Sequence, residues 1–299
     1  MYVVLGASGN TGNVVANNLL TRRQKVRVVA RNAAQLQPLA AKGAEVFIGD
    51  VTDMAALSKA FYKADAVYVM IPPNLKSNDI RGFQERVSDA TVAALKNSAV
   101  KHVVLLSSFG ADKASGTGPV VGLHNFEEKL NQLDGANILA LRAGYFMENT
   151  LPQAGVIRAA GAVIGPLRAD LKLPMIATKD IGAIAADALL RLDFRGHLTR
   201  ELLGQRDLDY TEVASTIGKA IGKPDLKYIQ APDDKVRASL VQMGMSDNLA
   251  GQLLEMTAAL NSGQMRPLEP RTGHNTTATS YETFVAEFFV PAYRQLSAA

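Results

Sequence analysis

Residues 2–12 read YVVLGASGNTG, an apolar segment that runs directly into a turn with a glycine at every third position. This pattern is typical of the first strand, turn and helix of a dinucleotide-binding fold. Gly6 suits the tight exit from the strand, Gly9 allows the backbone to approach a pyrophosphate, and Gly12 allows the next helix to pack closely on the sheet. The free N–H groups at the start of that helix would face the phosphates, with Asn10 and Thr11 as side-chain donors. The residues expected to bind the dinucleotide here are Gly6, Ser8, Gly9, Asn10, Thr11 and Gly12. The alternative is an ordinary strand-to-helix turn.

A basic residue follows the second apolar segment, Lys25–Ala30. Arg31 stands about twenty residues after the glycine loop, where an NAD-specific protein usually has an acidic residue for the ribose 2′-hydroxyl. A guanidinium pairs with a 2′-phosphate through two parallel hydrogen bonds, whereas a carboxylate would repel it. The sequence therefore predicts NADP(H) as cofactor in preference to NAD. The alternative is that Arg31 is a solvated residue at the end of a strand.

The composition excludes several classes of protein. The chain has 299 residues, of which 47% are hydrophobic and 20% charged, as in a soluble globular protein with a large core. The formal charge of +4 comes from dispersed Lys and Arg residues, so we expect no direct nucleic-acid partner. There is no cysteine, and the four histidines lie far apart in the sequence, so disulfides, thiolate catalysis and metal binding are not expected.

The sequence also predicts where the protein is found. No apolar run approaches the roughly 18 residues that span a bilayer. The first strand begins at residue 2, which leaves no room for a signal peptide. We therefore expect a cytoplasmic protein with no membrane partner.

Apolar strands alternate with helical patterns from residue 2 to about residue 149. This predicts a Rossmann-like α/β fold, a doubly wound parallel sheet with helices on both faces. The expected strands are Tyr2–Leu5, Lys25–Ala30, Glu45–Ile48, Ala66–Ile71, His102–Leu106 and Ile138–Leu141. Asp53 is expected to cap the helix that follows it, and a longer helix is expected over Ile80–Asn97. Right-handed crossovers bring the carboxyl ends of the strands to one edge of the sheet, where ligands bind.

A smaller C-terminal α/β lobe is expected to follow. It takes up mainly residues 151–299, with some segments returning to the dinucleotide-binding domain of residues 1–150. Short strands are expected within Gly161–Pro166, Glu201–Leu203 and Leu226–Ile229. Helices are expected after Thr178, over Tyr210–Ile221, Asp233–Met243 and Asp247–Ser262, and after a capping box formed by Thr279 and Glu282.

The ends of the third and fourth strands offer side chains for a ligand. Asp50 follows the third strand, where its carboxylate would accept a hydrogen bond from an adenine amino group, with Val51 beside the ring. The alternative for Asp50 is a turn or cap residue. The fourth strand ends at Met70, Ile71 and Pro72, and the proline stiffens the chain where it would pass the ribose and nicotinamide.

The ends of the fifth and sixth strands complete this edge. The fifth strand ends in Ser107 and Ser108, and the sixth runs into Gly144, Tyr145 and Phe146. Gly144, Tyr145 and Phe146 are expected to bind the cofactor, and Tyr145, Phe146 and Met147 would form an apolar wall beside the nicotinamide. The alternative for these rings is simple core packing.

Several of these segments together resemble the NmrA-like members of the atypical short-chain dehydrogenase/reductase superfamily. They are the glycine loop, Arg31, Leu105–Ser108, His124–Lys129 and Phe146–Asn149. The resemblance covers nearly the whole chain, most strongly up to about residue 190. It implies a Rossmann domain that binds NADP(H) and a small lobe that closes a substrate cleft over the nicotinamide.

Reductases of that superfamily use a Tyr and a Lys four residues later on one helix, assisted by a Ser at the end of the fifth strand. The resemblance places Lys129 at the Lys position and Ser107 or Ser108 at the Ser position. Asn125 stands at the Tyr position, and an amide cannot give up a proton as a phenol can. Ordinary carbonyl–alcohol chemistry is therefore not expected.

Some relatives, such as quinone oxidoreductases and triphenylmethane reductases, also lack the Tyr and still transfer hydride. An electron-poor acceptor needs little proton donation, and positioning supplies much of the rate. Our first hypothesis is thus an NADPH-dependent oxidoreductase that acts on a quinone or a similar electrophilic aromatic acceptor. Lys129 would contact the nicotinamide ribose, and His124 or Tyr145 would relay a proton. The alternatives are a solvated Lys129 and a structural His124.

The second hypothesis is a non-catalytic NADP(H)-binding redox sensor that acts through protein partners, which Asn125 favours. A sugar-nucleotide epimerase is a third and weaker hypothesis, because that chemistry relies on the missing Tyr. If the protein is an enzyme, its substrate is expected to be a small apolar or aromatic molecule. Met243, Met245 and Met256 would supply either an adaptable pocket or core packing. The physiological substrate and the oligomeric state are left open.

Overall fold

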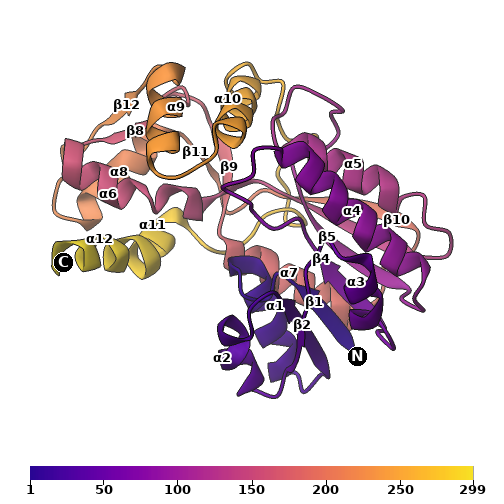
Figure 1. Ribbon diagram of the computed structural model, residues 1–299. Coiled ribbons are helices and arrows are strands. Elements are labelled where there is room, and N and C mark those ends of the chain that lie inside the picture. Colours follow the sequence, from indigo (N-terminus) through magenta and orange to yellow (C-terminus); the bar gives the residue numbers. More distant parts are fainter. Residues whose placement is uncertain (299) are drawn as a thin grey trace.

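A parallel sheet of seven strands forms the larger part of the molecule in the computed structural model, which describes residues 1–298 (Figure 1). From one edge to the other, the strands are β10 (His197–Leu202), β6 (Asn137–Ala143), β5 (His102–Ser108), β4 (Ala66–Val69), β1 (Tyr2–Leu5), β2 (Val26–Ala30) and β3 (Glu45–Ile48). The chain runs outward from β1 to β3 and then crosses back to β4 on the other side of β1. This reversal is the switch point at which doubly wound sheets bind ligands. The predicted doubly wound α/β fold is confirmed.

Helices cover both faces of the sheet. On one face α1 (Asn10–Thr21) packs against α7 (Thr178–Arg191), and on the other α4 (Ile80–Lys96) packs against α3 (Met54–Ala60) and α5 (Val120–Leu130). The strand residues alternate between the two cores, as the two-residue period of a strand requires. Val4 belongs to the core under α1 and α7, whereas Val3 and Leu5 belong to the core under α3, α4 and α5. A short 3-10 helix, η1 (Ala33–Leu36), and α2 (Gln37–Ala40) lie between β2 and β3.

Several strands differ in extent from the sequence prediction, and two of these differences have a clear structural reason. β4 ends at Val69 and not at Ile71, because its neighbour β1 ends at Leu5 and then turns away at Gly6. β10 begins at His197, four residues before the predicted strand, and pairs in parallel with β6 along its whole length. The first three residues of β10 are exposed at the edge of the sheet, so the strand lacks the apolar pattern that would have revealed its start.

The smaller lobe is built from short strands and helices (Figure 1). It contains a parallel pair, β8 (Val163–Gly165) and β12 (Tyr228–Gln230), and a three-stranded sheet in the order β11 (Asp207–Leu208), β9 (Leu173–Ile176), β7 (Tyr145–Phe146). Its helices are η2 (Met147–Thr150), α6 (Gln153–Ala160), α8 (Tyr210–Ala220), α9 (Asp233–Gln242), α10 (Asp247–Asn261), α11 (Tyr281–Phe284), the π-helical η3 (Val285–Phe289) and α12 (Val290–Ala298).

The two parts of the molecule share segments. Phe109, Ala111 and Val120 come from the first half of the chain but lie in the hydrophobic core of the smaller lobe. Conversely, α7 and β10 come from the second half and belong to the large sheet and its helical layer. Each of the two parts is therefore completed by segments from the other half of the chain.

The capping box predicted at Thr279 and Glu282 is wrong by one residue. Ser280 caps α11, accepting a hydrogen bond from the N–H of Thr283 at 3.1 Å. The hydroxyl of Thr279 instead donates to Asp180 of α7 at 2.7 Å. Thr279, which the local sequence predicted as the cap, forms a tertiary hydrogen bond instead.

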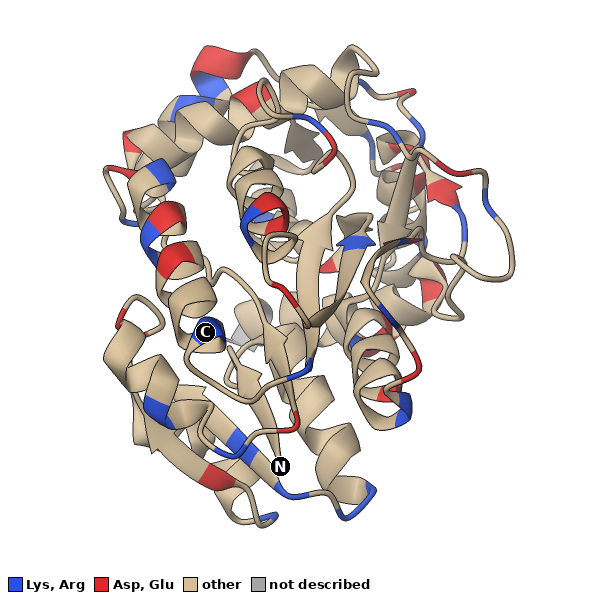
Figure 2. Cartoon of the chain, turned by 90° about the vertical axis from the view of Figure 1, so that its right-hand side faces the viewer, with Lys and Arg blue, Asp and Glu red and all other residues tan. Residues whose placement is uncertain are grey.

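Charges are mixed over the outer surface. Figure 2 shows Lys and Arg interspersed with Asp and Glu along the helices of one side of the molecule. Among residues 1–298, no helix has both the length and the apolar character needed to cross a membrane.

Candidate active site

The glycine loop has the close-packed geometry that its sequence predicts. Gly6 adopts a φ of +64°, a left-handed conformation that favours glycine. Its carbonyl oxygen accepts a hydrogen bond from the N–H of Gly9 at 2.9 Å, which closes the turn. A Cβ atom on Gly12 would lie 2.7 Å from the carbonyl carbon of Gly6 and closer still to its oxygen. The start of α1 therefore rests directly on the turn, and only glycine permits this approach.

The N-terminus of α1 presents free backbone donors. Gly9 is the N-cap residue, and the first hydrogen bond of the helix runs from the N–H of Asn13 to the oxygen of Gly9. The N–H groups of residues 10–12 therefore have no acceptor within the helix. No side chain caps this end, and no acidic residue lies in the first turn. Uncapped donors at the positive end of a helix form a site suited to a phosphate group.

The polar side chains of this loop differ in accessibility. Ser8 and Asn10 are exposed, whereas Thr11 is buried. The Thr11 hydroxyl accepts a hydrogen bond from the buried hydroxyl of Tyr68 at 2.9 Å. Burial raises the pKa of Tyr68 and keeps it protonated. Thr11 is thus held in place by the sheet, with its own proton left to donate.

Arg31 and Asp50 lie at the ends of the neighbouring strands β2 and β3. Arg31 is exposed. One oxygen of Asp50 accepts hydrogen bonds from the backbone N–H and the hydroxyl of Thr52, at 2.8 and 2.7 Å. Burial raises the pKa of Asp50, but these hydrogen bonds and the charge of Arg31 outweigh it, so that the pKa lies below its usual value. Asp50 therefore forms a local turn and is ionised, and Val51 beside it is half-buried against the sheet.

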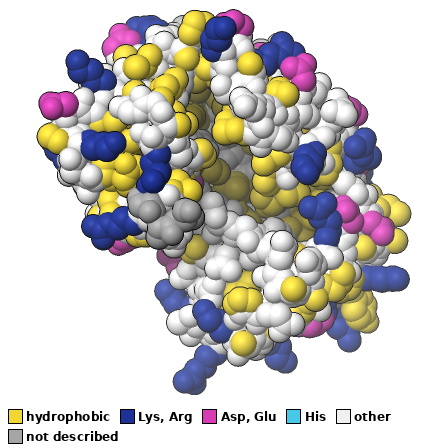
Figure 3. Space-filling view, turned by 60° about the vertical axis from the view of Figure 1, so that its left-hand side comes forward, with side chains coloured by type: hydrophobic (Ala, Val, Ile, Leu, Met, Phe, Trp, Pro, Cys, Tyr) yellow, Lys and Arg dark blue, Asp and Glu magenta, His cyan; other side chains and the backbone are white. Residues whose placement is uncertain are grey.

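A cavity of about 620 Å³ adjoins the glycine loop. It lies where the ends of β4, β5 and β6 meet the C-terminal lobe, and Figure 3 shows this region of the surface hollowed, with hydrophobic side chains along the hollow. Many of the predicted site residues line it: Gly6, Gly9, Asn10, Thr11, Met70, Ile71, Pro72, Ser107, Ser108, Gly144, Tyr145 and Phe146. The remaining predicted residues, Ser8, Gly12, Arg31, Asp50, Val51, His124 and Lys129, do not.

Lys129 points away from the cavity. Its ammonium group forms ion pairs with Glu85 and with Asp89 of α4, the latter at 2.6 Å. Partial burial alone would lower the pKa of Lys129, but these carboxylates raise it above its usual value, so the group stays charged. Asn125, at the Tyr position of the resemblance, also donates to Glu85, at 2.7 Å. The structure thus places both residues on the side of α5 that faces α4, and the ammonium group of Lys129 is directed to Glu85 and Asp89 and not to the cavity.

A different side of α5 faces the cavity. Val120 and Leu123 line it, and Glu127 follows one turn after Leu123. Leu123 and Glu127 are therefore the two residues of α5 that lie four positions apart, like the Tyr–Lys pair, and face the carboxyl ends of the strands. Helical periodicity explains the difference, since a shift of two residues turns a side chain by about 200° around a helix.

Glu127 anchors a buried polar group behind the cavity. The Ser107 hydroxyl donates a hydrogen bond to Glu127. The Arg142 guanidinium donates to the same carboxylate, with its Nε 3.0 Å from Oε1. Burial lowers the pKa of Arg142, but Glu127 raises it more, so the guanidinium remains charged. Ser107 is therefore held by an internal ion pair. Ser108, next to it, donates to a backbone oxygen, that of Phe109, at 2.9 Å.

His124 has a structural contact. Its Nδ1 lies 2.9 Å from the carbonyl oxygen of Ala111, which ties α5 to the loop after β5. His124 is half-buried but does not line the cavity. This contact fits the structural role that was the alternative to proton relay for His124.

Tyr145 is the phenol at the cavity. Its hydroxyl lies 3.3 Å from that of Tyr210, which donates to it, and the side chain of Asn149 is a further partner. Burial raises the pKa of Tyr145, so the hydroxyl stays protonated at neutral pH. Sequence reasoning missed Tyr210, because it comes from α8, far along the chain, and no local pattern links it to the site.

Helix α10 closes the cavity on the side of the C-terminal lobe. Leu249, Leu253, Met256 and Leu260 recur at helical spacing and line the cavity together. Of the methionines considered from the sequence, Met256 lies here, whereas Met243 is 65% exposed and packs in neither pocket nor core. The periodicity of α10 was visible in the sequence, but not the surface that it covers.

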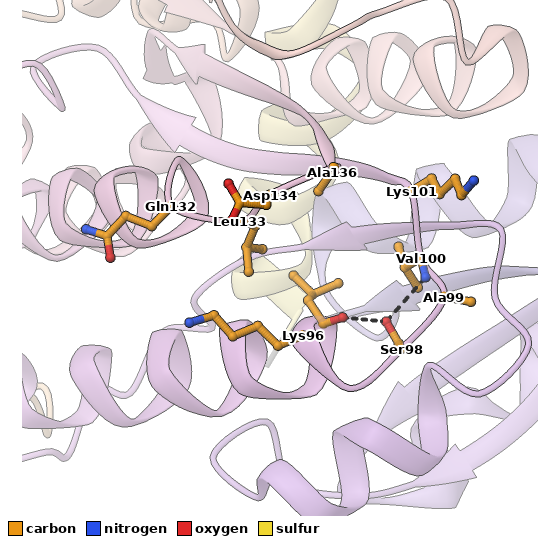
Figure 4. A pocket seen from close by; sticks show the side chains of 11 residues that line it. Lys96, Ser98, Ala99, Val100, Lys101, Gln132, Leu133, Asp134 and Ala136 are labelled. Carbon is orange, nitrogen blue, oxygen red and sulfur yellow. Dashed lines mark hydrogen bonds between the residues drawn. The ribbon is translucent and has the colours of Figure 1, made fainter.

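A second groove lies at the amino ends of β5 and β6 (Figure 4). It has a volume of about 450 Å³ and lies between the end of α4 and the turn from α5 to β6. Ser98 in this groove bonds only to nearby backbone, the oxygen of Leu95 and the N–H of Val100. None of the predicted site residues lies there.

The fold, the glycine loop and the adjoining cavity define a Rossmann-like dinucleotide-binding protein. Within that class, the chain belongs to the NmrA-like family, whose model matches residues 2–289. The resemblance to this family is thus confirmed.

Characterised relatives cover most of the chain. It is 27% identical over 260 residues to the NAD(P)H azoreductase of Xenophilus azovorans, with 86% of each chain covered. It is 28% identical over 288 residues to quinone oxidoreductase 2 of Escherichia coli, covering 93% of this chain and 95% of the relative. A crystal structure of the NADPH-dependent quinone oxidoreductase of Escherichia coli complexed with NADPH matches with a TM-score of 0.75 at 26% identity, covering 89% of this chain and 91% of that one.

Proposed function

We propose that this protein is an NADPH-dependent oxidoreductase that transfers a hydride to a quinone or to a similar electrophilic aromatic acceptor. One observation carries the proposal: a single cavity is lined at one end by the glycine loop and at the other by apolar side chains of α5, α10 and the β6–β7 segment. A nicotinamide nucleotide and a flat apolar acceptor would share this space. The printed names of the relatives, an azoreductase and a quinone oxidoreductase, support the reaction class.

The residues present suit NADPH. The uncapped N–H groups of residues 10–12 and the glycine-lined approach would hold the pyrophosphate. Arg31, exposed at the end of β2, would pair with the 2′-phosphate, and Asp50 lies beside it at the end of β3. When bound, NADPH supplies the hydride; the protein's part is to bind, orient and keep water out.

The cavity side chains suit an acceptor that needs little help with protons. Lys129 is tied to α4 and Ser107 to Glu127. Tyr145 is left as a hydroxyl group at the cavity that can donate a hydrogen bond to an acceptor oxygen, whereas Ser108 would first have to release the carbonyl oxygen of Phe109. Tyr145 is oriented by Tyr210. Such donors stabilise negative charge on a reduced oxygen without transferring a proton in the same step.

The test is NADPH oxidation, followed by loss of absorbance, with a panel of quinones and triarylmethane dyes and without acceptor. We expect acceptor-dependent oxidation with at least one uncharged quinone. Tyr145→Phe should lower kcat/KM for that quinone by about two- to tenfold, the worth of one hydrogen bond. Tyr62→Phe is the matched control, because Tyr62 is 63% exposed and outside the cavity. The proposal fails if no acceptor accelerates oxidation above the rate without acceptor.

The sensor hypothesis gains no support from the relatives, which are named as reductases. The position of Asn125, which motivated it, lies on the α4 side of α5 and not at the cavity.

A further inference from the structure

The cavity walls carry no ionisable acid or base other than tyrosine. Within the described residues 1–298, the lining includes no Asp, Glu, Lys, Arg or His. The acceptor end is formed by Phe109, Val120, Leu123, Leu253, Met256 and Leu260. Its polar members, such as Ser108, Tyr145 and Asn149, are all uncharged.

Two lining residues donate hydrogen bonds to carboxylates that lie behind the wall. Ser107 donates to Glu127, and Thr178 donates to Glu148 through its hydroxyl and through its N–H at 3.0 Å. Arg142 is the positive partner of Glu127, and its guanidinium group is bound in that ion pair. No Lys, Arg or His among the described residues lines the cavity, and Arg81, which follows the lining residue Ile80 on α4, faces Glu255 at 4.0 Å.

We propose, on the basis of the function proposed above, that the acceptor is an aromatic molecule without an anionic group. The cavity discriminates against acceptors of the same shape that carry a sulfonate or a carboxylate. Burying such an anion beside apolar side chains, without a cationic partner, costs a large part of its hydration free energy. The phosphates of a bound dinucleotide would add to the repulsion.

Substrate pairs separate this inference from the function on which it rests. The probes are 1,4-naphthoquinone, its 2-sulfonate and its 2-methylsulfonyl derivative, each measured with saturating NADPH. The sulfonate group withdraws electrons, so a lower rate with that compound cannot come from a weaker hydride acceptor. The methylsulfonyl compound has a similar size without charge. We expect kcat/KM to be on the order of 100-fold lower for the sulfonate than for unsubstituted 1,4-naphthoquinone, and not to fall for the methylsulfonyl compound.

A cation placed on α10 should reverse the preference. Leu253 lines the cavity and is half-buried, so an arginine there can reach both the cavity and solvent. Leu253→Arg should raise kcat/KM for the sulfonate about tenfold relative to the uncharged compound. Leu253→Gln is the control of similar polarity without charge and should not do so. If Leu253→Arg does not fold, Met256→Lys with Met256→Gln makes the same comparison.

The outcomes are distinct. Equal kcat/KM for charged and uncharged quinones overturns this inference and leaves the proposed function intact. Absence of turnover with all three quinones removes the proposed function and this inference with it. Strong preference for the uncharged compounds, relieved by the cationic variant alone, supports both.

Discussion

Replacing Gly12 with alanine should weaken both the fold and the binding of NADPH, because the new methyl group has no space. The added Cβ would lie 2.7 Å from the carbonyl carbon of Gly6, where a real Cβ atom keeps at least 3.0 Å. The obstacle is backbone, so it cannot rotate aside as a side chain can. The oxygen of Gly6 also accepts the hydrogen bond from Gly9 that closes the turn. Relief of the clash therefore displaces the loop that would carry the phosphates.

The expected cost is about 1–3 kcal/mol of unfolding free energy, the usual range for an added methyl group in a tightly packed position. Equilibrium denaturation in urea measures it, and titration with NADPH measures the accompanying loss of affinity. Gly155→Ala is the matched control. Gly155 is exposed in α6, and a Cβ there would meet nothing within 4 Å, so the variant should gain about 0.5 kcal/mol through helix propensity and bind NADPH as before. The reasoning is refuted if Gly12→Ala is as stable as the unchanged protein and binds NADPH equally well.

Three further changes test other parts of the molecule. Arg31→Asp should weaken NADPH binding by about 1–3 kcal/mol relative to NADH; an equal change for both nucleotides would show that Arg31 does not contact the phosphate. Lys129→Ala should leave kcat nearly unchanged and lower the unfolding free energy by about 0.5–1 kcal/mol, because it removes contacts with Glu85, Ser88 and Asp89 of α4 and none with the cavity. A large loss of kcat with intact stability would return Lys129 to the active site. Burial and nearby cations lower the pKa of His102 from 6.5, so the unfolded chain takes up the proton first and stability should fall as the pH drops below 6.5. His102→Gln should flatten that fall, and an identical pH profile of the denaturation midpoint for both proteins would contradict it.

The sequence was most informative where local chemistry decides the structure. The glycine spacing predicts the turn because steric contact between Gly6 and Gly12 tolerates nothing larger. Asp53 was expected to cap α3, and its side chain accepts hydrogen bonds from the first turn of that helix. In both places the decisive contacts lie within a few residues of each other along the chain.

Tertiary contacts decided the rest. Thr279 was predicted to cap α11 but donates a hydrogen bond to Asp180, nearly a hundred residues away. The start of β10 lacks an apolar pattern because it lies at the edge of the sheet. The rotation of α5 is fixed by its packing against α4, which turns Lys129 away from the cavity. Tyr210 reaches Tyr145 only through the fold of the C-terminal lobe.

The most direct test of the proposed reaction is a primary isotope effect on hydride transfer. NADPH carrying deuterium at the transferred position of the nicotinamide is compared with ordinary NADPH in anaerobic single-turnover reduction of 1,4-naphthoquinone. We predict that one NADPH is consumed per hydroquinone formed and that deuterium slows the step severalfold. Oxidation of NADPH without formation of hydroquinone would contradict the account. So would a rate of hydroquinone formation that is the same with and without the protein.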